Sequence, residues 1–319
     1  MSTLKDVAKH AGVSMITVSR VINYPGKVKK ETRVRVEEAM KKYRYAPNHV
    51  AKALVEKRSG IIDVFIPHSV DLSNPFFMNF IVGVSETLSK HMYSFLIRRD
   101  REKEHVCDGY IATGLLKDEL SDMYAYAYER EYPLVLFGHT QLEDVDCIDV
   151  DNVAGAAMGA RKLLDAGCKN LVMMNVDEDK DFTADRLTGF RQVAGGASQV
   201  IYAPNSVQGS YTATVELLKK MKPDGIFCAS DILALGVIQA VMDAGMEVPS
   251  DVSVVGFDGL GHNLLSNVHI TTIQQPVFEI GRQLAEVLLE RLNGRTAKVA
   301  RLIAPELLEG QSVRMATGI

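Results

Sequence analysis

Two short helices joined by a tight turn are the strongest structural signal in this chain, and they occupy its first 23 residues. Thr3 and Asp6 have the spacing of a capping box, which predicts a helix over residues 4–10. The apolar residues of that region share one helical face: Leu4, Val7, Ala8 and Ala11. Gly12 then stands where positive φ is needed, and Ser14 supplies the N-cap of a second helix that ends near residue 23. The N-terminal region is therefore predicted to be a small all-helical domain.

A third helix over residues 29–43 would complete the core of that domain. Its apolar residues recur at helical spacing: Val36, Ala39, Met40 and Tyr43. The second helix turns its own apolar residues inward, namely Val18, Val21 and Ile22. Its outward faces then carry Met15, Ile16, Thr17, Ser19, Arg20 and Asn23. Two exposed apolar side chains at the start of a helix indicate a contact surface.

Positive charge is concentrated in the same region. Residues 1–60 contain 14 Lys and Arg against 5 Asp and Glu, whereas the remaining residues contain 22 against 35. The net charge is +9 over the first part and −13 over the rest, although the whole chain carries only −4. A basic head on an acidic body is typical of a protein that docks one end on nucleic acid.

A helix-turn-helix protein places its second helix in the major groove of DNA, where the first residues of that helix meet base edges. Arg20 can then bind guanine O6 and N7, and Met15 or Ile16 can contact a thymine methyl group. Phosphate contacts are assigned to Ser14, Thr17, Ser19, Asn23, Lys5, Lys27 and Lys29. The alternative is a basic bundle without a partner, or one that binds an acidic protein. The glycine turn, both caps and the charge segregation favour DNA binding.

Further positions extend this pattern beyond the first two helices. They are Val7, Ala8, residues 11–14, residues 17–21, Asn23, Thr32, Arg33, Tyr45, Pro47, Asn48, Ala51 and Leu54. Together they resemble the headpiece of the LacI/GalR family of bacterial transcription regulators, and residues 14–20 are most similar to its catabolite control protein branch. The resemblance implies a homodimer on a palindromic double-stranded DNA operator, with Met15, Ile16 and Arg20 reading bases. The predicted DNA contacts are completed by Leu4, Thr32, Tyr45, Asn48, His49, Ala51 and Leu54.

Residues 47–60 are predicted to be a hinge between a headpiece, residues 1–46, and a body, residues 61–319. The segment has an Asn cap but is too short to be a stable helix alone in water. In the family, the corresponding segments of two subunits fold together on DNA. The residue that matches Leu54 inserts into the minor groove there. The alternative is a plain linker with one incidental leucine.

From residue 61 the pattern changes to short apolar strands that alternate with helices. Strands are predicted over residues 61–66, 94–98, 109–113, 134–137, 147–150, 170–174, 199–202, 225–228 and 253–257. Helices are predicted over residues 76–91, 118–131, 152–166, 186–195, 210–221, 231–244 and 278–292. This alternation predicts an α/β body with parallel sheets covered on both faces. About 260 residues divide best into two lobes with a ligand cleft beyond the carboxyl ends of the strands.

The body resembles the periplasmic-binding-protein-like effector domain of the same family. The resemblance implies a lobe N of about residues 61–149 and 276–304, and a lobe C of about residues 150–275 and 305–319. Two connections are shorter than the family pattern, over residues 99–106 and 195–199, and the first leaves no room for a crossover helix. The chain shows no leucine heptads near its end, which favours a dimer over a tetramer.

Candidate effector contacts follow the ends of the predicted strands. Ser73 or Asn74 is expected to cap the next helix, and Phe76 or Phe77 to present a ring to a ligand. Arg186 is expected at a helix start and matches the arginine that clamps effector oxygens in the family, with a surface ion pair as the alternative.

The remaining candidates lie late in the body, and they are Ser230, Asp258 and Gln275. Asp258 matches the family carboxylate that accepts sugar hydroxyls or purine donors, while Asp231 is expected to be an N-cap. His139 stands where many relatives have an aspartate. The effector is predicted to be a sugar or sugar phosphate. A purine-type corepressor and a phosphoprotein partner are the alternatives.

Enzyme motifs are missing from the sequence. It contains no P-loop, no strand-linked G-x-G-x-x-G, no H-E-x-x-H and no G-x-S-x-G elbow. Four scattered cysteines without metal-type pairs, and the lack of a secretion signal, indicate a reducing cytoplasm and no metal or cofactor. No apolar run is long enough to span a membrane. The sequence therefore predicts a cytoplasmic, nucleoid-associated DNA-binding repressor and not an enzyme.

Overall fold

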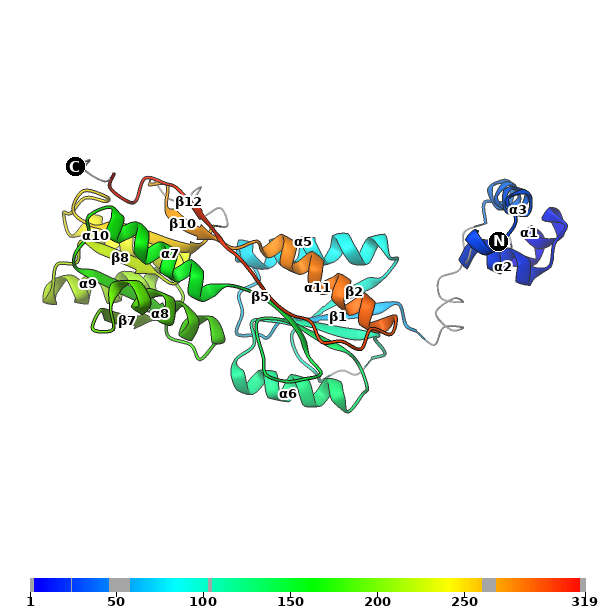
Figure 1. The fold of residues 1–319 in the computed structure, drawn as a ribbon, viewed down its shortest axis with the longest axis horizontal. Coiled ribbons are helices and arrows are strands. Elements are labelled where there is room, and N and C mark those ends of the chain that lie inside the picture. Colours follow the sequence, from blue (N-terminus) through cyan, green and yellow to red (C-terminus); the bar gives the residue numbers. More distant parts are fainter. Residues whose placement is uncertain (1–2, 24, 46–57, 103–104, 260–267, 316–319) are drawn as a thin grey trace. The chain divides into compact units, whose positions relative to one another are not determined.

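The computed structural model describes residues 3–23, 25–45, 58–102, 105–259 and 268–315. The chain forms two compact units, residues 1–60 and residues 61–319, and each is described by itself (Figure 1). Every helix in the described ranges is too short or too polar to cross a lipid bilayer.

The first unit is a bundle of α1 (Leu4–Ala11), α2 (Met15–Asn23), a 3-10 turn η1 (Pro25–Lys27) and α3 (Lys30–Tyr43). The predicted capping box is present, because the Thr3 hydroxyl accepts from Asp6 N and the Asp6 carboxylate accepts from Thr3 N. Gly12 ends α1 at a φ of 64°, and the Ser14 hydroxyl accepts from Thr17 N at 3.1 Å. The core consists of Val7, Ala8, Ala11, Val18, Val21, Val36 and Ala39. The three-helix prediction is confirmed.

The second unit contains two six-stranded sheets, and the first belongs to lobe N. Its strand order is β11-β5-β4-β3-β1-β2, and all its pairs are parallel. The strands are β1 (Ile61–Phe65), β2 (Ser94–Arg98), β3 (Gly109–Thr113), β4 (Leu134–Phe137), β5 (Asp146–Val150) and β11 (Ala300–Ile303). The helices α5 (Pro75–Lys90) and α11 (Val277–Leu292) cover one face, and α6 (Lys117–Tyr128) covers the other (Figure 1).

The second sheet belongs to lobe C and has the order β12-β10-β9-β8-β6-β7. Its strands are β6 (Leu171–Val176), β7 (Gln199–Ala203), β8 (Gly225–Cys228), β9 (Ser253–Asp258), β10 (Thr271–Gln274) and β12 (Glu306–Leu308). Its helices are α7 (Asn152–Asp165), α8 (Asp181–Ala194), α9 (Val207–Lys220) and α10 (Asp231–Asp243). The helix α7 packs beside α8, and α9 packs beside α10. The predicted parallel sheets are confirmed, and among the described strands only β12, at the edge of this sheet, is antiparallel to its neighbour.

The chain passes between the two sheets three times (Figure 1). It leaves lobe N after β5, returns after β10, and leaves again after β11. Because three segments join the lobes, a change in the angle between the lobes must bend all three together.

The connection from β2 to β3 contains no helix in its described residues, as predicted. Polar side chains cover the sheet at this place. Asp63 of β1 is buried, and its Oδ1 accepts from His105 Nε2 at 2.9 Å. The Arg98 guanidinium in turn donates to His105 Nδ1 at 2.6 Å. Burial raises the pKa of Asp63, although His105 and Arg98 oppose the shift.

The second short connection, residues 195–198, runs directly from α8 into β7. The start of α8 differs from the prediction, because the helix begins at Asp181 and not at residue 186. Lys180 occupies its N-cap position without a side-chain hydrogen bond, so no capping signal marks this helix start in the sequence. Arg186 consequently lies in the second turn of α8, and its predicted place at a helix start is wrong.

Candidate functional site

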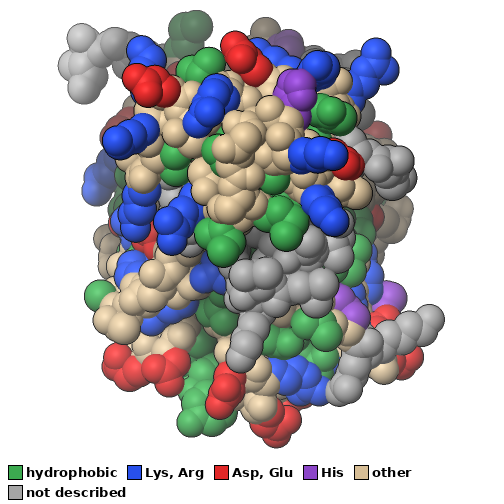
Figure 2. All heavy atoms as spheres, turned by 90° about the vertical axis from the view of Figure 1, so that its right-hand side faces the viewer, with side chains coloured by type: hydrophobic (Ala, Val, Ile, Leu, Met, Phe, Trp, Pro, Cys, Tyr) green, Lys and Arg blue, Asp and Glu red, His purple; other side chains and the backbone are tan. Residues whose placement is uncertain are grey.

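The exposed surface of α2 in the headpiece carries both apolar and basic side chains. Met15 is 50% exposed and Ile16 is 67% exposed, while Val18 of the same helix is fully buried in the core. Of the predicted DNA contacts, the exposed ones are Lys5, Ser14, Met15, Ile16, Arg20, Lys27 and Lys29. The half-buried ones are Leu4, Thr17, Ser19, Thr32 and Tyr45. Lys and Arg side chains are prominent in the upper part of the face in Figure 2.

Several predicted DNA contacts lie outside the described residues. They are Asn48, His49, Ala51 and Leu54, together with most of the hinge over residues 47–60. The side chain of Asn23 is also outside the description, although its backbone belongs to α2.

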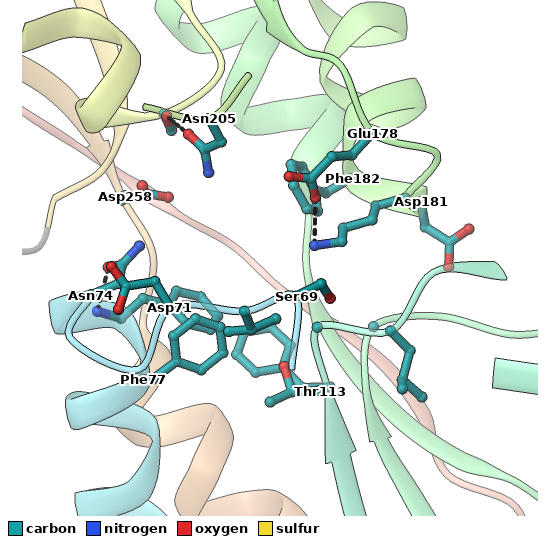
Figure 3. A pocket seen from close by; sticks show the side chains of 18 of the residues that line it. Ser69, Asp71, Asn74, Phe77, Thr113, Glu178, Asp181, Phe182, Asn205 and Asp258 are labelled. Carbon is teal, nitrogen blue, oxygen red and sulfur yellow. Dashed lines mark hydrogen bonds and ion pairs between the residues drawn. The ribbon is translucent and has the colours of Figure 1, made fainter. Parts of the chain in front are cut away.

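A cavity of about 460 Å³ lies between the lobes, where strands of both sheets end. All seven residues predicted to contact an effector line it: Asn74, Phe76, Phe77, Arg186, Ser230, Asp258 and Gln275. Figure 3 shows polar side chains from different elements around the same space, among them Asn74, Glu178, Asn205 and Asp258. Residues separated by about 200 positions in sequence thus meet at one site.

Arg186 is the most enclosed cation of the cavity, with only 4% of its surface exposed. Its Nε donates to Asn152 Oδ1 at 2.9 Å, and its Nη1 donates to the Ala229 carbonyl at 2.5 Å. The guanidinium also lies 3.6 Å from the ring centroid of Phe257. Burial lowers the pKa of Arg186 to about 10, so it stays positively charged at neutral pH. The alternative of a surface ion pair is wrong for this residue.

Asp258 ends β9 in a left-handed backbone conformation, with a φ of 131°. Its Oδ1 accepts from Gln275 Nε2 at 2.6 Å and lies 3.9 Å from Arg186 Nη1. Burial raises the pKa of Asp258, and the charge of Arg186 opposes the rise. The three side chains therefore form one buried polar group on the cavity wall.

Ser230, and not Asp231, is the N-cap of α10. The Ser230 hydroxyl accepts from Leu233 N at 3.2 Å and donates to Asn205 Oδ1 at 2.7 Å. Asp231 is buried behind the wall, where it accepts from Thr272 Oγ1 at 2.6 Å and from Gly259 N at 2.8 Å. The sequence could not separate the two residues, because both types are good N-caps.

The wall from lobe N is partly aromatic. Asn74 caps α5 by accepting from Phe76 N at 3.0 Å, which confirms the expected cap. The ring of Phe76 lies 4.9 Å from that of Phe77 and 5.2 Å from that of Phe137, measured between centroids. This cluster offers an apolar surface beside the polar groups of lobe C.

Other residues of the cavity were not predicted as effector contacts, although Ser73 was considered as a helix cap. The polar and charged ones are Ser69, Asp71, Ser73, Thr113, Lys117, Asp149, Asn152, Glu178, Lys180, Asp181 and Asn205. Burial raises the pKa of Asp149 to about 7. Most of these residues follow the ends of β1, β3, β5, β6 and β7, so the rule that ligands bind at carboxyl strand ends would have found them.

Two ion pairs connect the lobes at the edge of the cavity. His139, after β4, lies with Nε2 3.0 Å from Asp185 Oδ2 of α8. Lys117 Nζ of α6 lies 2.7 Å from Asp179 Oδ1. Donor atoms of His139, Asp149 and Asp185 lie within 4.8 Å of one another, a grouping that sequence spacing did not reveal.

Comparisons with known proteins give matches over both units. Residues 3–48 match the model of bacterial regulatory proteins of the lacI family, and residues 160–313 match that of a periplasmic binding protein-like domain. The uncharacterized HTH-type transcriptional regulator YvdE of Bacillus subtilis is 38% identical, over 98% of this chain and 99% of that protein. The ribose operon repressor of Halalkalibacterium halodurans is 32% identical, over 97% of this chain and 96% of its own length.

Solved structures agree with these sequence matches. The complex of the transcriptional regulator CelR with cellobiose has a TM-score of 0.74 at 27% identity, covering 98% of this chain and 100% of that one. The lac repressor dimer bound to operator and an anti-inducer has a TM-score of 0.78 at 23% identity, covering 98% of this chain and 99% of that one. The second likeness establishes a shared fold.

Proposed function

Because the chain belongs to the LacI family of bacterial transcription regulators, we propose that it is a repressor that binds a palindromic operator as a homodimer and responds to a sugar-like effector. Its curated relatives are transcription regulators and not enzymes, and the same class holds for this chain. The observation that carries the effector part is the convergence of seven predicted contacts on one cavity between two lobes.

The DNA part is supported by the exposed face of α2. Met15 and Ile16 keep large apolar side chains in solvent, and their burial against a partner would be favourable. Arg20 is exposed on the same helix, and a guanidinium matches the two acceptors of guanine in the major groove. This pattern suits base reading better than general phosphate binding.

The effector part is supported by the position of the cavity between lobes. A ligand that touches both walls favours one separation of the lobes, and it shifts an equilibrium only by its difference in affinity for the two states. The relative CelR is described in complex with cellobiose, and another relative is a ribose operon repressor, so a sugar is the preferred class here. Control of the body by a phosphoprotein partner stays the alternative.

The test of the DNA part is fluorescence anisotropy with an operator selected from random inverted repeats. Arg20→Ala is expected to weaken operator binding by about tenfold or more, because one good base contact contributes ~1–3 kcal/mol. Binding to random duplex should keep its salt dependence. Arg191→Ala, an exposed arginine of α8, is the control and should change neither quantity. Equal discrimination between operator and random duplex in Arg20→Ala and wild type would contradict the assignment.

A further inference from the structure

We propose that the effector is an uncharged saccharide larger than one ring, and not a sugar phosphate. The inference rests on the proposed function, and it concerns only the chemistry of the ligand in the cavity between the lobes.

The charge of the cavity argues against an anionic ligand. Its described lining contains three cationic side chains, Lys117, Lys180 and Arg186. It contains five carboxylates, from Asp71, Asp149, Glu178, Asp181 and Asp258. The formal balance is negative, whereas a phosphate monoester carries a charge of about −1.5 to −2 at neutral pH. Such a ligand would meet net repulsion in a partly desolvated site.

Each of the three cations already has a protein partner. Lys180 Nζ lies 2.6 Å from Glu178 Oε2, and the lysine side chain is only 12% exposed. Lys117 pairs with Asp179 at 2.7 Å, and Arg186 is engaged by Asn152, the Ala229 carbonyl and Asp258. A bound phosphate would have to displace one of these partners and leave a carboxylate or carbonyl without it, which costs free energy.

Helix N-termini are the other common phosphate site, and three of the helices that begin beside the cavity are α5, α8 and α10. Asn74 accepts from the backbone of α5, and Pro75 at its first position has no N–H. Ser230 accepts from the backbone of α10. Asp181 places a carboxylate in the first turn of α8. Capping side chains therefore already occupy the starts of α5 and α10, and a carboxylate near the start of α8 disfavours an anion there.

The remaining groups suit sugar hydroxyls and sugar rings. Carboxylates such as Asp258 accept hydrogen bonds from hydroxyl groups, and Asn205 adds an amide. Aromatic rings stand on opposite walls, with Phe77 on lobe N and Phe182 on lobe C (Figure 3). The negative faces of aromatic rings attract the weakly positive C–H groups of sugar rings.

The size of the cavity favours more than one ring. Its volume of about 460 Å³ lies within the range of roughly 300–1,000 Å³ for pockets that bury drug-sized ligands. A single monosaccharide is smaller than such ligands and fills less of this volume than a disaccharide does.

Isothermal titration calorimetry of the full chain with matched pairs of ligands tests the proposal. Each pair consists of a neutral sugar and its 6-phosphate, and the sugars are cellobiose, trehalose, sucrose and glucose. The neutral member of each binding pair is expected to bind at least about tenfold more tightly, and a disaccharide more tightly than glucose. A phosphorylated ligand that binds more tightly than its neutral partner would overturn the charge argument. Glucose that binds more tightly than every disaccharide would overturn the size argument.

A charge variant sharpens the test. Glu178→Gln releases Lys180 and removes one negative charge, so affinity for the phosphorylated pair members should rise by about tenfold, while neutral ligands should change less. Glu309→Gln breaks the Lys162 ion pair away from the cavity and is the matched control. Equal phosphate affinities in both variants would contradict the inference. Loss of operator preference in wild type would contradict the proposed function instead, so the two failures are distinguishable.

Discussion

At the scale of single residues, Asp258 shows how burial and hydrogen bonding give one carboxylate a defined direction. Gln275 donates to its Oδ1, and the Arg186 guanidinium lies 3.9 Å from the same atom. Gln275 is itself buried and follows β10 at a crossing between the lobes. The Asp258 carboxylate thus lines the ligand cavity and is hydrogen-bonded to the segment that crosses between the lobes.

Asp258→Asn should reduce effector affinity by about tenfold to a hundredfold, because a hydrogen bond to a charged group contributes ~1.5–3 kcal/mol. Operator binding without effector should stay unchanged, since the headpiece is a separate compact unit. Calorimetry with the tightest ligand of the panel measures the first quantity, and anisotropy measures the second. The control is Asp165→Asn, an exposed carboxylate of α7. Undiminished ligand affinity in Asp258→Asn would show that this carboxylate does not contact the effector.

Asp149 should make stability depend on pH. Burial raises its pKa from 3.8 to about 7 in the folded protein, so the folded state holds a proton that the unfolded state loses first. Stability from this group is therefore present below the lower value and is lost as pH rises toward the higher one. In urea titrations, Asp149→Asn is expected to gain stability relative to wild type as pH increases from 5 to 8. A constant difference over that range, as expected for Asp165→Asn, would contradict the assignment.

At the scale of elements, the connection from β2 to β3 has no helix in its described residues, and a hydrogen-bonded group of buried Asp63 with half-buried His105 and Arg98 lies there instead. An apolar helix would cover the sheet without polar groups, whereas this loop must satisfy a buried carboxylate. With this arrangement a short loop is enough to cover the sheet beside Asp63. Single substitutions in the polar group are then expected to destabilise that part of the sheet.

His105→Ala is expected to lower the free energy of unfolding by about 1–3 kcal/mol, because Asp63 loses a hydrogen-bond donor while it stays buried. Urea unfolding followed by circular dichroism measures the change. His91→Ala, an exposed histidine after α5, serves as the control. If both variants unfold at the same urea concentration as wild type, the polar group contributes nothing to stability.

Most elements could be predicted because their signals are local. Each of these signals spans only a few residues. Examples are the capping box of α1, the glycine that ends α1, and the apolar runs of β1, β3 and β4. The strands β10 and β11 were missed as strands. Thr271–Gln274 has no apolar run, and Ala300–Ile303 is largely exposed, so their pairing with β9 and β5 defines them.

The candidate site was predictable to the extent that its residues follow strand ends. Asn74, Ser230 and Asp258 do so, and all three line the cavity. The partners of Arg186 were not predictable, because Asn152 lies 34 positions away in the sequence and belongs to a different helix of lobe C, α7. The contact of His139 with Asp185 likewise depends on the angle between lobes.

At the scale of the whole molecule, the chain joins a basic headpiece to an acidic body that contains the ligand cavity. Three segments join the lobes, and ion pairs of His139 and Lys117 connect them at the cavity edge. A ligand that binds both walls therefore either favours or opposes the separation of the lobes that these segments and ion pairs stabilise. Thermodynamic reciprocity then requires that operator and ligand change the affinity of each other by the same factor.

The coupling between operator and effector is tested most directly by the operator affinity of the full chain with and without a saturating neutral saccharide. The ligand is the one found by calorimetry, and anisotropy with the selected inverted repeat gives both dissociation constants. We expect operator affinity to change by about 5–150-fold, with an equal change in saccharide affinity when operator is bound. An operator affinity that is unaltered at saturating saccharide would contradict it.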